Sequence, residues 1–174
     1  MPATMLCYSI ANTSDKAISL RVGGWLENAV SRAAIKAGAA EPSATPIEGV
    51  TGLLLAAKPQ QRGAADDGSM AIALLGDSGQ TLDARALSAK WIDALRSKDD
   101  GIPANSGVVQ SKPRPLDPGE SIAFRFAICW HFANGHRGDI FPGSLLRRNE
   151  QRRHYAKFFD DAGQIAQELQ RRHD

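Results

Sequence analysis

Residues 118–134 read Pro-Gly-Glu-Ser-Ile-Ala-Phe-Arg-Phe-Ala-Ile-Cys-Trp-His-Phe-Ala-Asn. The Pro-Gly pair is a turn signal, and after it large apolar residues alternate with small or polar ones. A period of two over this length is typical of a β-strand with one buried face, which we place at 121–132. The strand carries an indole, an imidazole and an amide to its end. We therefore expect a binding rim there, formed by Trp130, His131 and Asn134.

Shorter apolar runs surround this strand along the chain. Residues 4–11 and 17–26 alternate in the same way, and the turn formers between them predict a hairpin. Residues 50–57 and 70–75 predict a second hairpin, whose loop we place at 60–68. Several short strands separated by turn signals indicate a mostly β chain. We expect an antiparallel β-sandwich, which can be incomplete in this chain.

The remaining segments predict loops and one short helix. The region rich in Ala, Gly and Pro at 29–48 reads as a loop with one helical turn. Leu87, Trp91 and Leu95 share one helical face, which predicts a helix at 84–96. Residues 97–119 contain four prolines and predict a long polar loop. Residues 133–146 predict an irregular, Gly-rich segment.

The last segment predicts an amphipathic helix. Its apolar residues recur at helical spacing and form one stripe: Tyr155, Phe158, Phe159, Ala162, Ile165, Ala166 and Leu169. Such a face must be buried, either on the preceding sheet or on another domain. We therefore expect a β-sandwich domain over 1–146 and a linker helix over 147–174.

Composition narrows the class of protein. The chain has 174 residues, 43% of them hydrophobic and 23% charged, with a net charge of +2, which suits one globular domain. Its basic cluster at 147–157 lacks interleaved aromatics and reads as a solvated helix face, so we expect no nucleic-acid partner. No apolar run could cross a bilayer and no signal peptide is present, which favours the cytoplasm. The strand-like sequence begins almost at once, so we expect the natural domain to begin upstream of Met1.

The two cysteines and one tripeptide raise questions that sequence leaves open. We expect Cys7 and Cys129 to be reduced core residues, with a disulfide between them as the alternative. Neither has the spacing of a metal site, and we expect no metal and no cofactor. Asn12-Thr13-Ser14 matches the glycosylation sequon, which matters only in a secreted protein.

Catalytic motifs are absent from the sequence. No phosphate-binding Gly-rich motif, no H-E-x-x-H and no G-x-S-x-G occurs. Most carboxylates fall in loops and turns, where burial cannot raise a pKa, so no general-acid pair stands out. We assign no catalytic residue. A second candidate rim is Trp25, Glu27 and Asn28, although a core Trp25 and a solvated Glu27 are the favoured interpretation of this segment.

Three segments resemble a known family. The first is Tyr8-Ser-Ile-Ala-Asn-Thr-Ser-Asp with Gly24-Trp-Leu-Glu-Asn28. The second runs from Leu116-Asp-Pro-Gly-Glu-Ser to Trp130-His-Phe-Ala-Asn, and the third is His154-Tyr-Ala-Lys-Phe-Phe-Asp-Asp-Ala162. These segments resemble the N-terminal β-sandwich region of glycoside hydrolase family 116, which contains non-lysosomal glucosylceramidase. The family usually has proline where Ala133 stands, which alters the local turn.

The resemblance implies a part of a larger enzyme. Family members are retaining enzymes that cleave β-glucosides or glucosylceramide with two carboxyl groups on an (α/α)6 barrel that follows the sandwich. No position here matches those carboxyl groups, so the chain resembles a fragment or a split gene whose partner is that barrel. The last helix would then contact the barrel through Tyr155, Phe158, Phe159 and Ile165. The alternatives are a free-standing glycan- or protein-binding module and a complete small hydrolase.

Overall fold

The computed structural model describes residues 1–60, 66–83, 103, 105–135 and 151–173. Within these residues the fold is mostly β and its sheets are antiparallel, as the sequence predicts. The helix expected at 84–96 lies outside the described residues. So do most of the irregular segment 133–146 and the first four residues of the basic cluster, 147–150.

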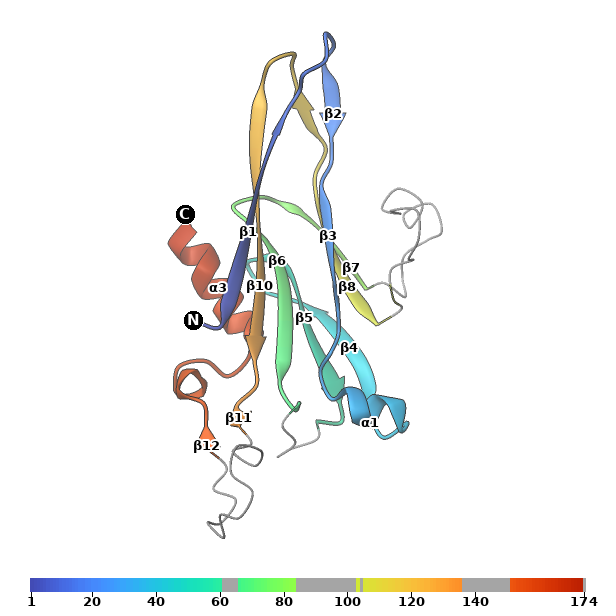
Figure 1. Cartoon of the computed structure of the whole chain (residues 1–174), viewed down its shortest axis with the longest axis vertical. Coiled ribbons are helices and arrows are strands. Elements are labelled where there is room, and N and C mark those ends of the chain that lie inside the picture. Colours follow the sequence, from blue (N-terminus) through green and yellow to red (C-terminus); the bar gives the residue numbers. More distant parts are fainter. Residues whose placement is uncertain (61–65, 84–102, 104, 136–150, 174) are drawn as a thin grey trace, which may run out of the picture.

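Two main sheets form the layers of the sandwich (Figure 1). The larger has the order β1-β10-β6-β5-β4, with bounds β1 Ala3–Ala11, β10 Ser121–His131, β6 Ser69–Leu75, β5 Thr51–Lys58 and β4 Glu41–Pro46. The smaller has the order β3-β8-β7, with bounds β3 Gly23–Glu27, β8 Ser106–Ser111 and β7 Gly79–Asp83. Two short pairs complete the strands: β2 Ile18–Leu20 with β9 Arg114–Leu116, and β11 Asn134–Gly135 with β12 Gln151–Arg152.

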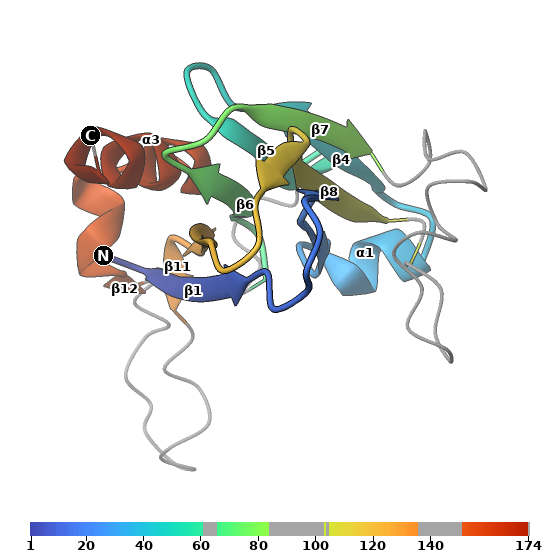
Figure 2. The ribbon, with the colours of Figure 1, turned by 90° about the horizontal axis from the view of Figure 1, so that it is seen from above.

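Helical segments cover the outer face and one end of the sandwich. They are α1 Arg32–Lys36, η2 His154–Lys157 and α3 Ala162–His173. Seen from above, α3 and the three-stranded sheet lie on opposite sides of the five-stranded sheet (Figure 2). The helix thus rests on the chain's own sheet. The sequence left open whether its apolar stripe would be buried there or on another domain.

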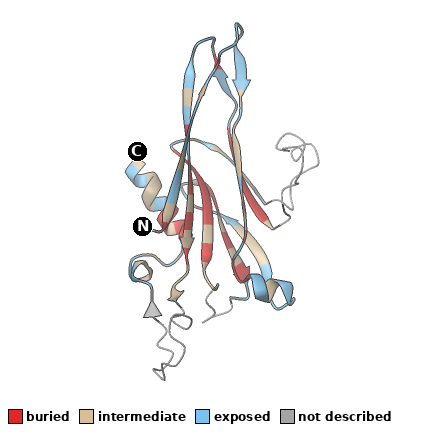
Figure 3. Ribbon diagram, viewed as in Figure 1, coloured by how far each residue is buried: buried red, intermediate tan, exposed pale blue. Residues whose placement is uncertain are grey.

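The period of two in β10 divides the core into two halves. Phe124 and Phe126 point between the sheets, where they pack with Ile72 and Val109. Cys129 and its odd-numbered neighbours point the other way, toward α3. Figure 3 shows that the buried residues concentrate in the middle of the sandwich, where both halves of this core lie.

The first predicted hairpin is wrong. β1 pairs with β10 over nine residues, from Ala3 opposite Cys129 to Ala11 opposite Ser121, and β2 pairs with β9 instead. The cause is Asn12, which is 3% exposed. Its Nδ2 donates to the carbonyls of Lys16 and Leu116, at 2.8 and 2.9 Å, and so directs the chain toward β9. The second predicted hairpin is confirmed, because β5 pairs with β6.

Two predicted loops contain strands. The segment 97–119 holds β8 and β9, and the segment 29–48 holds β4 after the expected helical turn α1. β8 is buried along its whole length, so it shows no apolar–polar alternation that sequence could reveal.

The C-terminal helix is shorter than predicted. Tyr155 lies in the 3-10 helix η2, and α3 begins only at Ala162. The break is made by Asp161, whose Oδ1 accepts a hydrogen bond from the Gln164 backbone N–H at 2.9 Å. This is the bond of a helix N-cap, and it fixes the start of α3.

Candidate functional site

The end of β10 brings His131 and Tyr155 together from segments 24 positions apart. Their rings meet edge to face with centroids 5.5 Å apart. The Tyr155 hydroxyl donates to the Phe132 carbonyl at 2.9 Å and accepts from the Phe132 N–H at 3.2 Å. A single side chain therefore pairs with the backbone just after β10 as a strand would, and it fixes η2 beside the strand end.

His131 belongs to this contact between the end of β10 and η2, and it is not exposed on a rim. Its side chain is 5% exposed, and Nε2 is buried with no hydrogen-bond partner among the described residues. The alternation of β10 places it on the helix side, opposite Trp130. In this position His131 cannot donate a hydrogen bond to a sugar, so the predicted rim loses one of its three members.

Trp130 and Asn134 are the partly accessible members of the first rim. Trp130 is half-buried on the face of β10 between the sheets, where it pairs in register with Met70. Asn134 is also half-buried and pairs with Arg152 in the short β11–β12 ladder. The two side chains therefore occupy different surroundings at the same end of β10.

The second rim divides in a similar way. Trp25 is 46% exposed, and Glu27 shares its outward face of β3 because the two are two residues apart. The Glu27 carboxylate lies 3.6 Å from the Arg32 guanidinium. Asn28 is structural, since it is 2% exposed and its Nδ2 donates to the Ala56 carbonyl at 2.7 Å.

The two predicted rims lie at one end of the sandwich (Figure 1). A small apolar cluster connects them. Val30, which follows β3, packs with Ala57, and Phe132 from the end of β10 packs against the same cluster. The sequence predicts both rims, but this connection depends on contacts between distant segments.

The four aromatic and apolar residues expected to contact a second domain differ in accessibility. Ile165 is 0% exposed on the chain's own sheet, so the expectation that it faces another domain is wrong. Tyr155 and Phe159 are half-buried, and Phe159 packs against the core beneath α3. Phe158 is 66% exposed, with the His154 ring against it at 5.2 Å.

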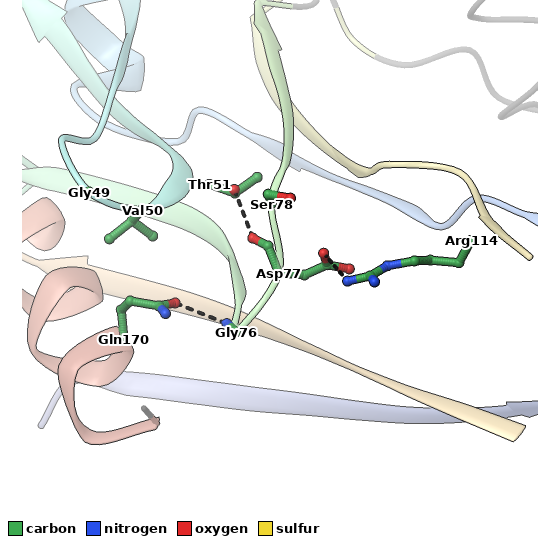
Figure 4. Close-up of a pocket in the computed structure, with 8 residues that line it drawn as sticks. All are labelled: Gly49, Val50, Thr51, Gly76, Asp77, Ser78, Arg114 and Gln170. Carbon is green, nitrogen blue, oxygen red and sulfur yellow. Dashed lines mark hydrogen bonds and ion pairs between the residues drawn. The ribbon is translucent and has the colours of Figure 1, made fainter.

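A pocket that the sequence did not indicate lies at the C-terminal end of β6 (Figure 4). Its volume is about 570 Å³, and it is lined by Gly49, Val50, Thr51, Gly76, Asp77, Ser78, Arg114 and Gln170. Arg114 forms an ion pair with Asp77 at 2.7 Å, and the Gly76 N–H donates to Gln170 Oε1 at 3.0 Å. Since these polar groups bind one another, the residues that line the pocket connect the sheets to α3.

The glycosylation sequon is not usable in this fold. The Asn12 amide that a glycan would modify is buried and makes the two hydrogen bonds described above. Its Oδ1 also accepts from the Ser14 hydroxyl at 2.7 Å. Attachment of a sugar would break this turn.

The cysteines are both free, but only one matches the prediction of a core residue. Cys129 is 0% exposed, and Cys7 is exposed on β1. Burial raises the pKa of the Cys129 thiol to about 12. Cys7 pairs in register with Arg125, which is also exposed, so the described residues leave this part of the sheet face uncovered.

We expect a thiol reagent to label the native protein once. Cys129 should react at least about 100-fold more slowly than Cys7, because few of its thiols are ionised at neutral pH. Mass spectrometry of the labelled chain at intervals would give the two rates. Labelling of Cys129 as fast as Cys7 in the native protein would contradict the burial described here.

In the described ranges, no three His, Cys, Asp or Glu side chains come together as metal ligands would. None of the helices that the structure describes has the length and hydrophobicity that crossing a bilayer demands.

The fold and the site together define a β-sandwich domain with an aromatic strand end and a helix packed on its larger sheet. A family model described as "beta-glucosidase 2, glycosyl-hydrolase family 116 N-term" matches residues 1–174, and the chain belongs to this family. The resemblance noted in the sequence is thereby confirmed over its whole length. No match was found among curated proteins.

Proposed function

We propose that this domain is the non-catalytic β-sandwich of a β-glucosidase or glucosylceramidase-like enzyme, and that it packs on an (α/α)6 catalytic barrel. The family match supports the link to such an enzyme. The contact would lie at the end of the sandwich where β10 and η2 meet, and it would shape one edge of the sugar cleft.

One observation carries this choice of surface. Phe158 is the most exposed large apolar side chain in the described part of the chain, at 66%. Tyr155 bonds to the Phe132 backbone and so holds this segment beside the end of β10. A rigidly placed, exposed aromatic is the usual anchor of a protein interface.

Trp130 and Asn134 are the rim residues that this arrangement leaves for a sugar. Trp130 offers an aromatic ring and Asn134 an amide that can donate and accept hydrogen bonds. Both precede η2 in the chain and lie at the same end of the sandwich as Phe158 (Figure 1). Docking through Phe158 would therefore bring them next to a catalytic domain.

The test measures binding between this domain and a family 116 catalytic domain supplied in trans. We expect Phe158→Asp to weaken association roughly 30-fold, because burial of a phenylalanine contributes about 2 kcal/mol. Ile18→Asp is the matched control, since Ile18 is 38% exposed on β2 at the opposite end of the sandwich. The 174-residue chain alone should not hydrolyse an aryl β-glucoside.

Two results would refute the proposal. The first is equal binding by the wild type and Phe158→Asp. The second is turnover by the isolated chain, which would place catalytic groups within it.

A second candidate function is a free-standing glycan-binding module, and Trp25 is the observation in its favour. An exposed indole can stack on the apolar face of a pyranose, and the adjacent ion pair of Glu27 and Arg32 offers both an acceptor and donors to hydroxyls. Asn28 anchors the end of β3 and so fixes this row of side chains.

We expect Trp25→Ala to abolish binding of a β-glucan oligosaccharide if the module reading is right. Trp25→Tyr should retain a measurable part of it, because an aromatic face remains. Isothermal titration calorimetry of the 174-residue chain measures both. Absence of binding by the wild type at millimolar oligosaccharide would remove this candidate.

A further inference from the structure

The edge strand β1 has no role in the proposed function. It lies at the end of the five-stranded sheet and pairs only with β10 among the described strands. Its sequence, Ala-Thr-Met-Leu-Cys-Tyr-Ser-Ile-Ala, has no charge, no proline and no glycine. Natural edge strands usually carry such residues, or a bulge, to prevent pairing with other chains.

The backbone of β1 has an open side whose groups can be assigned. The Trp130 N–H donates to the Pro2 carbonyl at 3.0 Å, and the Asn12 N–H donates to the Glu120 carbonyl at 2.9 Å. The register between these two points is unbroken. Even-numbered residues therefore bond to β10, and the N–H and C=O groups of Met5, Cys7 and Ser9 point outward.

Exposed apolar side chains lie along the same strand. Met5 is 46% and Tyr8 51% exposed, and both are among the large hydrophobic side chains left uncovered in the described residues. Tyr8 already touches Phe126 edge to face on its inner side, with ring centroids 6.3 Å apart. Its other side is open.

We propose that β1 is a dimerisation edge and that its occupant is β1 of a second copy, paired antiparallel about Cys7. This register overlaps all nine residues of both strands. It places Cys7 opposite Cys7 and Met5 opposite Ser9, so that the outward backbone groups of both copies form about six hydrogen bonds. Leu6 then lies opposite Tyr8 of the partner, which covers the open side of that ring.

Charge and symmetry favour a second copy as the occupant. Because β1 is uncharged, two copies meet without like-charge repulsion along the strand. Antiparallel pairing of identical strands is a two-fold contact and closes at the dimer. The result is one continuous sheet running through both molecules.

The first test is the mass of the 174-residue chain by analytical ultracentrifugation over a range of concentrations. We expect a monomer–dimer equilibrium, and Ser9→Pro should raise the dissociation constant roughly 30-fold by removing one outward donor from each copy. The Ser9 N–H makes no bond to β10, so the fold should remain. Ser9→Ala is the control and should bind as the wild type does.

The second test is chemical cross-linking with a short bis-maleimide. Cys7 sits on the two-fold axis, where paired Cα atoms are about 5.5 Å apart, so dimers should cross-link. Cys129 is buried and should not react, and Cys7→Ser should abolish the product. Met5→Lys serves as a second edge variant should Ser9→Pro unfold, as judged by circular dichroism.

Several outcomes would overturn the proposal. They are a monomer at every concentration, a dimer that neither Ser9→Pro nor Met5→Lys weakens, and assemblies larger than two copies. None of them bears on docking through Phe158, which the Phe158→Asp experiment tests separately.

Discussion

Gly68→Ala should lower the free energy of unfolding by about 3 kcal/mol, a large effect for one methyl group. A Cβ on Gly68 would overlap the carbonyl oxygen of His131 and lie 2.8 Å from Cδ1 of Phe132. The obstacle on one side is backbone, which cannot rotate away as a flexible side chain can. The loop before β6 would therefore have to move.

The movement would reach the candidate site. Gly68 immediately precedes Ser69, which pairs in register with His131. The Ser69 hydroxyl accepts a hydrogen bond from the Ala162 N–H at 2.8 Å, at the start of α3. Displacement of this segment would thus disturb the end of β10 and the first turn of the helix together.

Urea denaturation of Gly68→Ala, with Gly49→Ala as the control, measures the effect. Gly49 has a φ of +71° and nothing within 4 Å of its Cβ position, so alanine there costs only backbone strain, about 1 kcal/mol. The difference between the two variants isolates the close approach at His131. Equal costs would mean that the end of β10 is less tightly enclosed than the structure shows.

Local pattern could predict the central strands because each is either a clear alternation or an apolar run between turn formers. β10 and β1 alternate clearly, and β5 and β6 are apolar runs bounded by turn formers. β8 could not be found in this way. Its sequence Ser-Gly-Val-Val-Gln-Ser is buried on both sides, and no period survives.

The pairing of strands lies beyond what local pattern can show. The first hairpin was predicted because turn formers lie between 4–11 and 17–26, yet those turn formers belong to a crossover fixed by Asn12. The partner of β1 is more than 100 residues away. Only the contacts of the folded chain decide between such alternatives.

The sequence contains a signal for the break between η2 and α3, but the continuous apolar stripe makes it easy to overlook. Asp161 followed three residues later by Gln164 is the spacing of a capping box, which marks a helix start. The stripe continues through this point because η2 and α3 both pack on the protein. Periodicity alone therefore predicted one helix where there are two helical segments.

The sequence proposed both candidate rims, but it could not show how far each of their residues is buried. Alternation already put Trp130 and His131 on opposite faces of β10, so only one of them could line an open rim. The burial of His131 depends on Tyr155, and that of Asn28 on Ala56. Neither contact can be predicted from the sequence that surrounds His131 or Asn28.

Ile165→Ala should be the second strongly destabilising change, by about 3 to 4 kcal/mol. Ile165 is 0% exposed and packs with Ala71, Ala73 and Ala127 of the sheet beneath α3. These small side chains let the helix approach closely, and they cannot expand to fill a cavity. The free energy of transferring the side chain from water and that of forming the cavity should therefore appear almost fully as lost stability.

The matched control is Phe158→Ala, which removes a larger side chain that is 66% exposed. It should cost less than about 1 kcal/mol in the isolated domain, because little of its burial is lost. Thermal or urea unfolding of both variants gives the comparison.

The comparison separates two roles within one apolar stripe. α3 is tied to the domain at its start by Ser69 and at its end by Gln170, whose Oε1 accepts from the Gly76 N–H. A helix held in this way belongs to the sandwich, and Ile165 stabilises it. If Ile165→Ala cost no more than Phe158→Ala, α3 would not be resting on its own sheet. The stripe would then have to be assigned to a partner domain from end to end.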